Sequence, residues 1–542
     1  MLLNGTLGVL PDSIVKEIET HKQTLTNILS SKFADQSYIL GLDRNVDAKF
    51  YHWILDDLNK YYDQIEGNQY EYIPRNQQEL IKFNTILYFD KIWNDFHYPI
   101  IKFYQYQHAS LFNEILQDFN QYISNNDKKN HKFKVKPVEM RKIYDSLNKF
   151  LKEVHNFYTN LLKKFTQFEN PLISNQFLSN FDIPQNEIRK TSNLDLQENL
   201  SILIHRCLLN LGNLSRHRSF IEMSYVTPCL SNSNFWKFRN LNSDSKSSLV
   251  KPLFEKALKY YHACIHILPS FNEPYNHIGM IYNLIDDKYQ AVYWFLRSNF
   301  TGSNEFKVAT NNLLAILKKK TWLTDQLLKF YNDSSKSKKN IKRLNYLFIC
   351  LICYYFLPDL YHNGPNIVKN FKYIKVENDF FNQNFVASIM PVNDIDFHLQ
   401  QLIILSCFQK LIDNNSDEDV KFKFNKFVFR YIDNLLNFLT NIPLKKFKSK
   451  ILILSRYILN WIKENKLMLR ILQFKHSTLE GLANLFNSLL DSIDVSQPIR
   501  YYLFDEDVLV KGLSIIKFNF KDFKDQHLAD TKDSNILNGD YS

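Results

Sequence analysis

Apolar residues recur at spacings of three and four over most of the chain, which is the pattern of helices that bury one face. Polar connectors, several with proline or glycine, separate these periodic stretches. Glycine occurs only 11 times in 542 residues, whereas sheet-rich folds and phosphate-binding loops need more of it. The pattern therefore predicts an all-α fold. The predicted helices span residues 11–33, 47–64, 76–123, 137–168, 196–221, 305–331, 340–357, 396–415, 419–440, 447–464 and 474–492.

Residues 273–298 are predicted to form a helical hairpin, and this hairpin also repeats. Its small and aromatic residues fall at the positions of a tetratricopeptide (TPR) unit, where two helices cross. A shift back by one TPR period of 34 residues brings Ala291 onto Ala257 and Phe295 onto Tyr261. Such repeats stack into arrays that act as binding scaffolds. The matching positions in the hairpin are Gly279, Tyr282, Ala291, Phe295 and Ser298.

An insertion splits the preceding hairpin. Gly279 lies 12 positions before Ala291, whereas Gly212 lies 45 positions before Ala257. Because insertions in repeat arrays usually emerge as loops on one face, the extra residues predict a loop at about 222–248.

Three basic clusters lie in or beside predicted connectors. The chain has 67 Lys and Arg against 56 Asp and Glu, a formal charge of +11, which favours a polyanionic partner. Phe133 and Phe447 are interleaved with the lysines, and aromatic rings stack on unpaired bases. A solvated loop or a localisation signal is the competing interpretation of each cluster, but we expect at least one to bind nucleic acid. The candidates are Lys128, Lys129, Lys132, Lys134, Lys136, Lys338, Lys339, Lys342, Arg343, Lys445, Lys446 and Lys448.

Motifs of catalysis and metal binding are missing from the sequence. No Gly-x-x-x-x-Gly-Lys loop, Gly-x-Ser-x-Gly elbow or His-Glu-x-x-His motif occurs. His262 and His266 flank Cys264 on a predicted helix, but structural zinc needs about four ligands and no others are near in sequence. Cys350 and Cys353 lie in an apolar helix and are expected in the core. We therefore expect no catalytic residue, no metal and no cofactor.

Targeting and membrane signals are also missing. The first residues, Met-Leu-Leu-Asn-Gly-Thr, lack the charged start and long apolar run of a secretory signal. The longest apolar run, residues 346–357, is shorter than the ~20 residues that a membrane helix needs. Sparse cysteines are typical of a reducing compartment. We expect a soluble intracellular protein with no membrane partner.

Three sequence blocks together resemble the Est/Smg family. The first is Glu273-Pro-Tyr-Asn-His-Ile-Gly-Met, continued by Gln290-Ala-Val-Tyr-Trp-Phe-Leu-Arg-Ser298. The second is His205-Arg-Cys-Leu-Leu-Asn-Leu-Gly-Asn-Leu-Ser-Arg-His-Arg218, and the third is Asp505-Glu-Asp-Val-Leu-Val-Lys-Gly512. The family contains the "ever shorter telomeres" telomerase subunit and the Smg-type adaptors of nonsense-mediated mRNA decay. The resemblance covers about residues 10–520 and is greatest to the Est-type subunit.

The resemblance implies a 14-3-3-like/TPR helical array followed by a second helical-hairpin domain. We accordingly expect a first domain at 1–335, which contains the insertion at about 222–248, and a C-terminal helical domain at 336–525. Residues 526–542 are polar and are expected to be a disordered tail.

The resemblance also implies a groove for a phosphopeptide or another anion. In the decay adaptors a lysine and an arginine bind the phosphate, and the arginine matches Arg216. This chain departs from the motif at Asn213 and His217. Just after Trp93-Asn94, where the lysine is expected, it has Phe96-His-Tyr-Pro99, with Lys102 only nearby. Arg216 is therefore expected either to bind an anion or to make a structural hydrogen bond. The other positions expected to face the groove are Asn276, Met280, Asn283, Arg297 and Asn311, with a core position as the alternative for Met280.

By this resemblance we expect a non-catalytic telomerase subunit in the nucleus, at chromosome telomeres. Its expected partners are telomerase RNA, the telomerase reverse transcriptase, single-stranded telomeric DNA and a telomere end-binding protein. The chain ends soon after the third block, so we expect no PIN-type nuclease domain and no enzymatic activity. An mRNA-decay adaptor that binds a phosphorylated helicase is the first alternative. A generic TPR protein-interaction scaffold is the second.

Overall fold

In the residues that the computed structural model describes, the regular secondary structure is helical, apart from two isolated β-bridges. The predicted all-α class is therefore confirmed. The chain divides into two compact units, Met1–Leu268 and Pro269–Ser542. The described residues are 10–31, 35–67, 85–124, 136–170, 179–183, 188–191, 193–226, 249–302, 306–319, 341–357, 377–378, 380–381, 395–415, 417–440, 448–491, 510 and 512–515.

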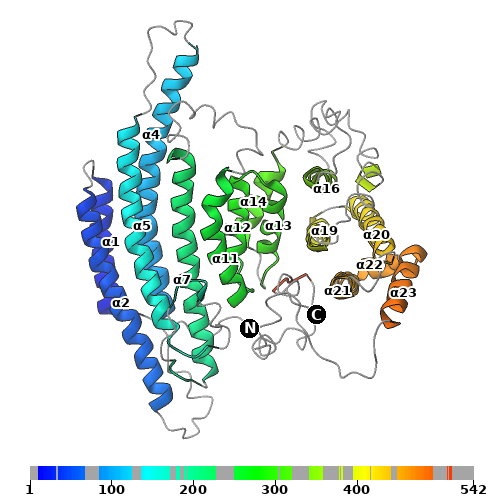
Figure 1. Cartoon of the computed structure of the whole chain (residues 1–542), viewed down its shortest axis with the longest axis horizontal. Coiled ribbons are helices and arrows are strands. Elements are labelled where there is room, and N and C mark those ends of the chain that lie inside the picture. Colours follow the sequence, from blue (N-terminus) through cyan, green and yellow to red (C-terminus); the bar gives the residue numbers. More distant parts are fainter. Residues whose placement is uncertain are drawn as a thin grey trace. The chain divides into compact units, whose positions relative to one another are not determined.

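The first unit is built of long helices that run side by side in Figure 1, where α1, α2, α4, α5 and α7 lie next to one another. Short 3-10 and π-helical segments extend several of them. The elements are α1 (Asp12–Ser30), α2 (Gln36–Gly67), α3 (Thr85–Ile92), η2 (Trp93–His97), α4 (Tyr98–Ser124), α5 (Pro137–Phe165), α7 (Leu194–Ile221), η3 (Glu222–Val226), η4 (Lys251–Phe254) and α11 (Glu255–Ile267).

Helix α5 is the central helix of this unit, because it packs against α2, α4 and α7. It starts at Pro137, whose missing N–H and fixed φ suit the first turn of a helix. Its apolar residues recur every three or four positions, and most of that face is buried. The buried face consists of Met140, Leu147, Phe150, Leu151, Val154, Phe157, Tyr158, Leu161, Leu162 and Phe165.

The two predicted hairpins are present, one in each unit. In the first unit α7 pairs with α11, although α7 ends at Ile221 and α11 begins at Glu255. In the second unit α12 (Glu273–Leu284) pairs with α13 (Lys288–Asn299). The hairpin split by an insertion is thus confirmed, while residues 227–248 of that insertion lie outside the described residues.

A glycine sits under an aromatic ring at each helix crossing. A Cβ placed on Gly212 would lie 2.7 Å from Tyr261 Cε1, and one placed on Gly279 would lie 2.7 Å from Phe295 Cδ1. Real Cβ atoms are not found this close to a carbon atom, so both crossings require glycine. The same glycine–aromatic contact occurs in both hairpins, as the predicted repeat requires.

The second unit contains the remaining helices. Helix α13 packs against α12, α14, α16 and α19, and every residue from Ala291 to Asn299 is buried. The unit consists of α12, α13, α14 (Lys307–Leu317), α16 (Ile341–Phe356), α19 (Ile395–Asn415), α20 (Glu418–Thr440), α21 (Lys448–Glu464), α22 (Lys466–Leu472) and α23 (His476–Leu490).

The division at Leu268 differs from the domain boundary expected at 335. Because α13 packs against α16 and α19, the repeat hairpin of residues 273–299 groups with the helices that follow it. The expected tail at 526–542 lies outside the described residues.

A short stretch of the third sequence block packs against the end of this hairpin. Gly512, with φ +78°, accepts a hydrogen bond on its carbonyl from Gly302 N at 3.1 Å. Thr301 and Leu513 form an antiparallel bridge, and Ser514 N donates to Phe300 O at 2.7 Å. A Cβ on Gly512 would lie 2.6 Å from Pro269 O. The block therefore needs its glycine both for backbone conformation and for close approach.

Most predicted helices are present, with differences at their ends. The helix predicted at 47–64 begins earlier, at Gln36, and the one predicted at 474–492 is preceded by α22. Asn465 caps α22, since its side chain accepts from Leu467 N and Met468 N, both at 3.0 Å. Within the described part of the chain, no helix combines the length and apolar character needed to cross a bilayer.

Candidate functional site

Arg216 lies on α7 at the crossing with α11. Its Nε donates a hydrogen bond to the Tyr261 hydroxyl at 3.3 Å, and the same hydroxyl donates to Asn213 Oδ1 at 2.8 Å. Burial raises the pKa of Tyr261 to about 12, although the nearby Arg216 cation acts in the opposite direction. The Asn213 departure from the family motif is therefore part of the network that orients Arg216.

A second cation, Lys102 of α4, reaches the same region through two aromatic side chains. Its Nζ lies 5.2 Å from the centre of the Tyr98 ring, and that ring lies 6.2 Å from the His217 ring. His217 Nε2 is in turn 3.3 Å from an Arg216 Nη. The Gln105 amide nitrogen fixes His217 from the other side, 2.7 Å from Nδ1. Helices α4 and α7 thus bring Lys102 and Arg216 into one chain of contacts.

The segment that was expected to supply the lysine faces inward instead. Trp93–His97 is a π-helix, and Phe96 and His97 are both buried. Lys102, five residues after His97, is exposed. The arrangement of Lys102 and Arg216 around Tyr98 and His217 is suited to an anionic ligand, since guanidinium and ammonium groups both pair with phosphate oxygens. We call Tyr98, Lys102, Arg216 and His217 the α4–α7 cation pair region.

The groove positions expected in the repeat are not all on the surface. Asn276 is 3% exposed, and its Oδ1 accepts from Asn312 Nδ2 at 3.0 Å. Arg297 is 1% exposed, with its guanidinium 5.1 Å from the centre of the Tyr275 ring. The expectation that these two side chains face an open groove does not hold in this structure. Arg297 is buried because α13 packs against four helices, and Asn276 is buried because α12 packs against α13 and α14.

The other expected groove residues are more accessible. Asn283 is half-buried, and its Oδ1 accepts from Lys288 Nζ at 2.7 Å at the turn between α12 and α13. Met280 is half-buried, with its sulfur 3.7 Å from Asn276 Nδ2, and Asn311 is exposed. Their role in binding stays a prediction.

Of the predicted nucleic-acid residues, only Lys136 has a described side chain. It precedes α5 with φ 44°, and its Nζ pairs with Glu114 at 2.7 Å. Lys342 and Arg343 lie on α16 and Lys448 lies on α21, but their side chains are outside the described part. The residues Lys128, Lys129, Lys132, Lys134, Lys338, Lys339, Lys445 and Lys446 lie outside the described residues.

The cysteine and histidine spacings noticed in the sequence do not gather into sites in the described structure. Cys264 is buried and its thiol donates to His205 O at 3.6 Å, while His262 and His266 are exposed on the same helix. Cys353 is buried in α16, as expected for a core residue, and Cys350 on the same helix is half-buried.

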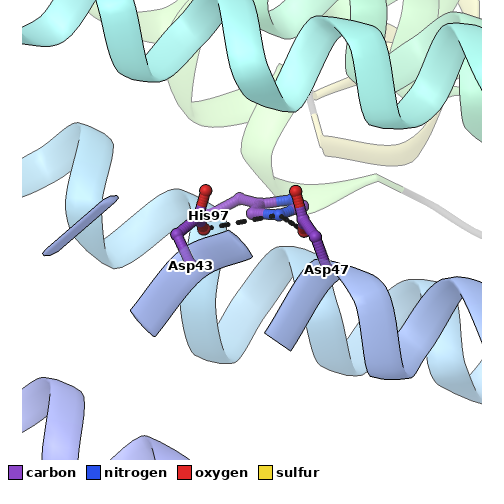
Figure 2. A group of neighbouring side chains, drawn as sticks. All are labelled: Asp43, Asp47 and His97. Atoms are coloured by element: carbon purple, nitrogen blue, oxygen red, sulfur yellow. Dashed lines mark hydrogen bonds and ion pairs between the residues drawn. The ribbon is translucent and has the colours of Figure 1, made fainter. Parts of the chain in front are cut away.

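A buried polar cluster that the sequence analysis missed lies between α2 and η2. Figure 2 shows Asp43 and Asp47, one turn apart on α2, pointing toward the ring of His97. His97 Nε2 is 2.8 Å from Asp47 Oδ1 and 3.8 Å from Asp43 Oδ1, and its Nδ1 is 3.0 Å from the Tyr158 hydroxyl. The i, i+4 spacing of the two aspartates can be recognised in the sequence. His97 cannot be recognised as their partner, because it lies about 50 residues further along the chain and in a π-helical segment.

Burial governs the protonation of this cluster. It lowers the pKa of His97 to about 4, with the Asp43 carboxylate opposing the shift. Burial also raises the pKa of both aspartates well above the usual value, and the neighbouring Asp47 carboxylate adds to this for Asp43. Charged forms are disfavoured here because the surrounding protein replaces water.

Two family models match the chain. Residues 87–222 match "Telomerase activating protein Est1", and residues 257–520 match "Est1 DNA/RNA binding domain". The first match contains the α4–α7 cation pair region, whereas the second begins in α11 and runs through the helices of the second unit.

Curated relatives include proteins of two kinds. The Saccharomyces cerevisiae "Nonsense-mediated mRNA decay factor EBS1" is 26% identical over 80% of this chain and 50% of its own length. The S. cerevisiae "Telomere elongation protein EST1" is 21% identical over 85% of this chain and 66% of its own length. The chain therefore spans about half to two thirds of the relatives that it matches.

A solved structure described as "Crystal structure of Est1 and Cdc13" has the same fold. It superposes with a TM-score of 0.69 and 19% identity, over 97% of this chain and 90% of the solved chain. At this identity the likeness establishes the helical architecture.

Proposed function

This chain belongs to the Est/Smg family, and from that premise we propose that it is a non-catalytic subunit of the telomerase holoenzyme. It binds telomerase RNA and single-stranded telomeric DNA, and it recruits or activates telomerase at chromosome ends. The observation that carries the proposal is the match of residues 257–520 to an Est1 DNA/RNA-binding domain, next to the match of 87–222 to a telomerase-activating protein.

Nucleic-acid binding is supported by charge as well as by the family match. The formal charge is +11, and three lysine-rich clusters occur in the sequence, two of them within the matched residues 257–520. Lysines that contact phosphates release counterions, which makes binding strong at low salt and weak at high salt. Aromatic residues in two of the clusters supply stacking surfaces for unpaired bases.

The proposed mechanism is tethering. A scaffold that binds RNA and reverse transcriptase with one surface and a telomere end-binding protein with another raises the local enzyme concentration at the chromosome end. The solved relative contains Est1 together with Cdc13, which supports a protein partner of the end-binding kind for this chain. The place of action that follows is the nucleus, at the telomere.

The α4–α7 cation pair region fits a role in this assembly. Arg216 and Lys102 together present two positive charges beside Tyr98 and His217, and an RNA phosphate or a phosphorylated side chain is the matching ligand. Arg216 also holds the Tyr261 hydroxyl, so it serves both the fold and the ligand.

A second candidate function is an adaptor of nonsense-mediated mRNA decay that binds a phosphorylated helicase. The specific observation that favours it is the 26% identity with the yeast decay factor EBS1, against 21% with yeast EST1. In that case the α4–α7 cation pair region would bind a phosphopeptide, and Arg216→Ala would reduce phosphopeptide affinity without changing affinity for single-stranded DNA.

Binding of single-stranded G-rich DNA by the purified chain, measured against salt, tests the proposal. Three variants each replace the lysines of one cluster by alanine, beginning with Lys128, Lys129, Lys132 and Lys134. Loss of four phosphate contacts is expected to lower affinity and to reduce the salt slope by about 3.

A charge-matched control replaces four exposed lysines outside the clusters, Lys16, Lys149, Lys152 and Lys307. It is expected to alter affinity and salt slope much less than at least one cluster variant does. The nucleic-acid part of the proposal fails if none of the three cluster variants differs from this control.

A further inference from the structure

We propose that Asp43, Asp47 and His97 bind one divalent metal ion, zinc, at the junction of α2, η2 and α5. One ligand atom from each residue can be chosen so that all three lie within 4.8 Å of one another. In Figure 2 the two carboxylates point at the same edge of the imidazole ring from one side of α2. Two aspartates one helical turn apart and a histidine from a second element form a three-residue ligand set.

The strongest observation is the state of Asp43. Its side chain is 1% exposed, and neither carboxylate oxygen has a hydrogen-bond partner among the residues that the structure describes. A buried carboxylate without a partner is costly, because it loses water and gains nothing in exchange. A cation between Asp43, Asp47 and His97 would satisfy it directly.

The distances already approach those of a coordination shell. Nε2 of His97 is 2.8 Å from Asp47 Oδ1 and 3.8 Å from Asp43 Oδ1. Zinc binds nitrogen and oxygen at about 2.0–2.2 Å, so its ligand atoms lie about 3.3 Å apart in a tetrahedral site. A small rotation of the two carboxylates accommodates the ion.

The contacts around the His97 ring are of the kind that orient a metal-bound histidine. The other ring nitrogen of His97, Nδ1, is 3.0 Å from the Tyr158 hydroxyl of α5. Such a partner fixes the orientation of the ring and leaves Nε2 for the metal. Phe150, Phe157 and Tyr158 pack edge-on around the imidazole at centroid distances of 5.5 to 6.4 Å, which keeps bulk water away.

The ligand set favours zinc over the hard cations. Magnesium and calcium take six or more oxygen ligands and magnesium keeps several waters, whereas this site offers one nitrogen and two carboxylates in an enclosed space. Imidazole with carboxylate suits zinc, with a water molecule or the second oxygen of one aspartate completing four ligands. The ion would link α2 to the continuous helical segment formed by α3, η2 and α4.

Zinc itself is the probe in the experiment that tests this site. The full chain is stripped with a chelator, incubated with zinc chloride and desalted, and bound zinc per chain is measured by mass spectrometry. Wild type is expected to retain about one zinc, and the first unit, which holds the site, is expected to unfold at a temperature about 5 °C higher when the zinc concentration is about 100 times its Kd. Asp43→Asn and His97→Gln are expected to retain none at this site and to lose the shift.

The controls separate loss of the ligand from loss of the fold. Asp43→Asn keeps the shape of the side chain, so the metal-free variant is expected to fold with the same circular dichroism as wild type. Tyr158→Phe is expected to bind zinc about tenfold more weakly, because the ring support is lost. His205→Gln, at a buried histidine of α7 outside the cluster, is expected to keep both the zinc and the shift.

Two results overturn the proposal. One is wild-type protein that retains no zinc and shows no zinc-dependent shift. The other is zinc retention that is the same in Asp43→Asn and in wild type, which would place the bound ion elsewhere, for example on the exposed histidines of α11.

Discussion

Gly279 lies against the ring of Phe295, where a Cβ atom would be 2.7 Å from Cδ1 and 2.8 Å from Cε1. Gly212 has the same relationship to Tyr261 in the other hairpin. At both crossings the glycine packs against a buried aromatic ring of the partner helix.

Gly279→Ala is expected to lower the free energy of unfolding by about 1–3 kcal/mol, because the new methyl group overpacks the crossing. This overpacking cost is larger than the roughly 1 kcal/mol by which alanine, compared with glycine, stabilises a helix. Gly41→Ala in α2 is the matched control, since a Cβ there meets nothing within 4 Å and should stabilise the protein.

Chemical denaturation followed by circular dichroism measures both variants. A second change, Phe295→Leu, should recover part of the loss in Gly279→Ala because it shortens the opposing side chain. Equal effects of the two glycine substitutions would contradict the packing at this crossing.

Tyr261→Phe is expected to destabilise the first unit by about 1–2 kcal/mol. The change removes a buried hydroxyl that accepts from Arg216 and donates to Asn213. Asn213 then loses a partner, and Arg216 loses the contact that orients it. Tyr38→Phe, at a site 70% exposed on α2, is the control and should have no measurable effect on unfolding.

Stability is expected to fall as the pH falls below about 6.5, partly through His205 of α7 and His398 of α19. Burial lowers the pKa of His205 to about 3, with Arg206 adding to the shift, and lowers that of His398 to about 4. Between these values and the unfolded pKa of about 6.5, the unfolded chain binds protons that the folded chain does not. Unfolding is therefore favoured as acid is added.

Each histidine should cost about 2 kcal/mol at pH 5 relative to pH 7. His205→Gln is expected to remove its share of this loss, measured as urea unfolding at a series of pH values. His52→Gln, on the exposed side of α2, is the control. An unchanged pH dependence in His205→Gln would mean that His205 becomes protonated within the folded protein.

Arg297→Ala is expected to destabilise the second unit by about 3 kcal/mol or more. The side chain is 1% exposed and stacks on Tyr275, so its removal leaves a cavity in addition to the lost contact. Arg297→Lys should recover little, because an ammonium group does not replace a stacked planar guanidinium. Arg141→Ala, at an exposed position on α5, should change stability by less than about 0.5 kcal/mol.

The sequence predicted the hairpins well because their signals are local. Gly279 and Phe295 lie at fixed TPR positions, and a shift of one period finds Tyr261 opposite Gly212. The fold class followed from helical periodicity and scarce glycine. These features depend on residues near one another in the sequence or on a repeat that displays them twice.

The site was harder to predict because it depends on packing between distant segments. Arg297 occupies a repeat position that can face a groove, but α13 has neighbours on all sides and the side chain is buried. His97 contacts Asp43 and Asp47 from a π-helical segment, Trp93–His97, that lies about 50 residues further along the chain. Neither the crowding around α13 nor the π-helical segment leaves a recognisable pattern in a single sequence.

The two proposed functions differ most directly in the RNA that the protein contacts. Crosslinking in cells, followed by sequencing of RNA bound to the full chain, measures this. The telomerase account predicts strong enrichment of one abundant noncoding RNA, and reduced recovery of that RNA in the lysine-cluster variant that weakens DNA binding. Crosslinks distributed over many mRNAs, with no enriched noncoding RNA, would contradict it and favour the decay adaptor.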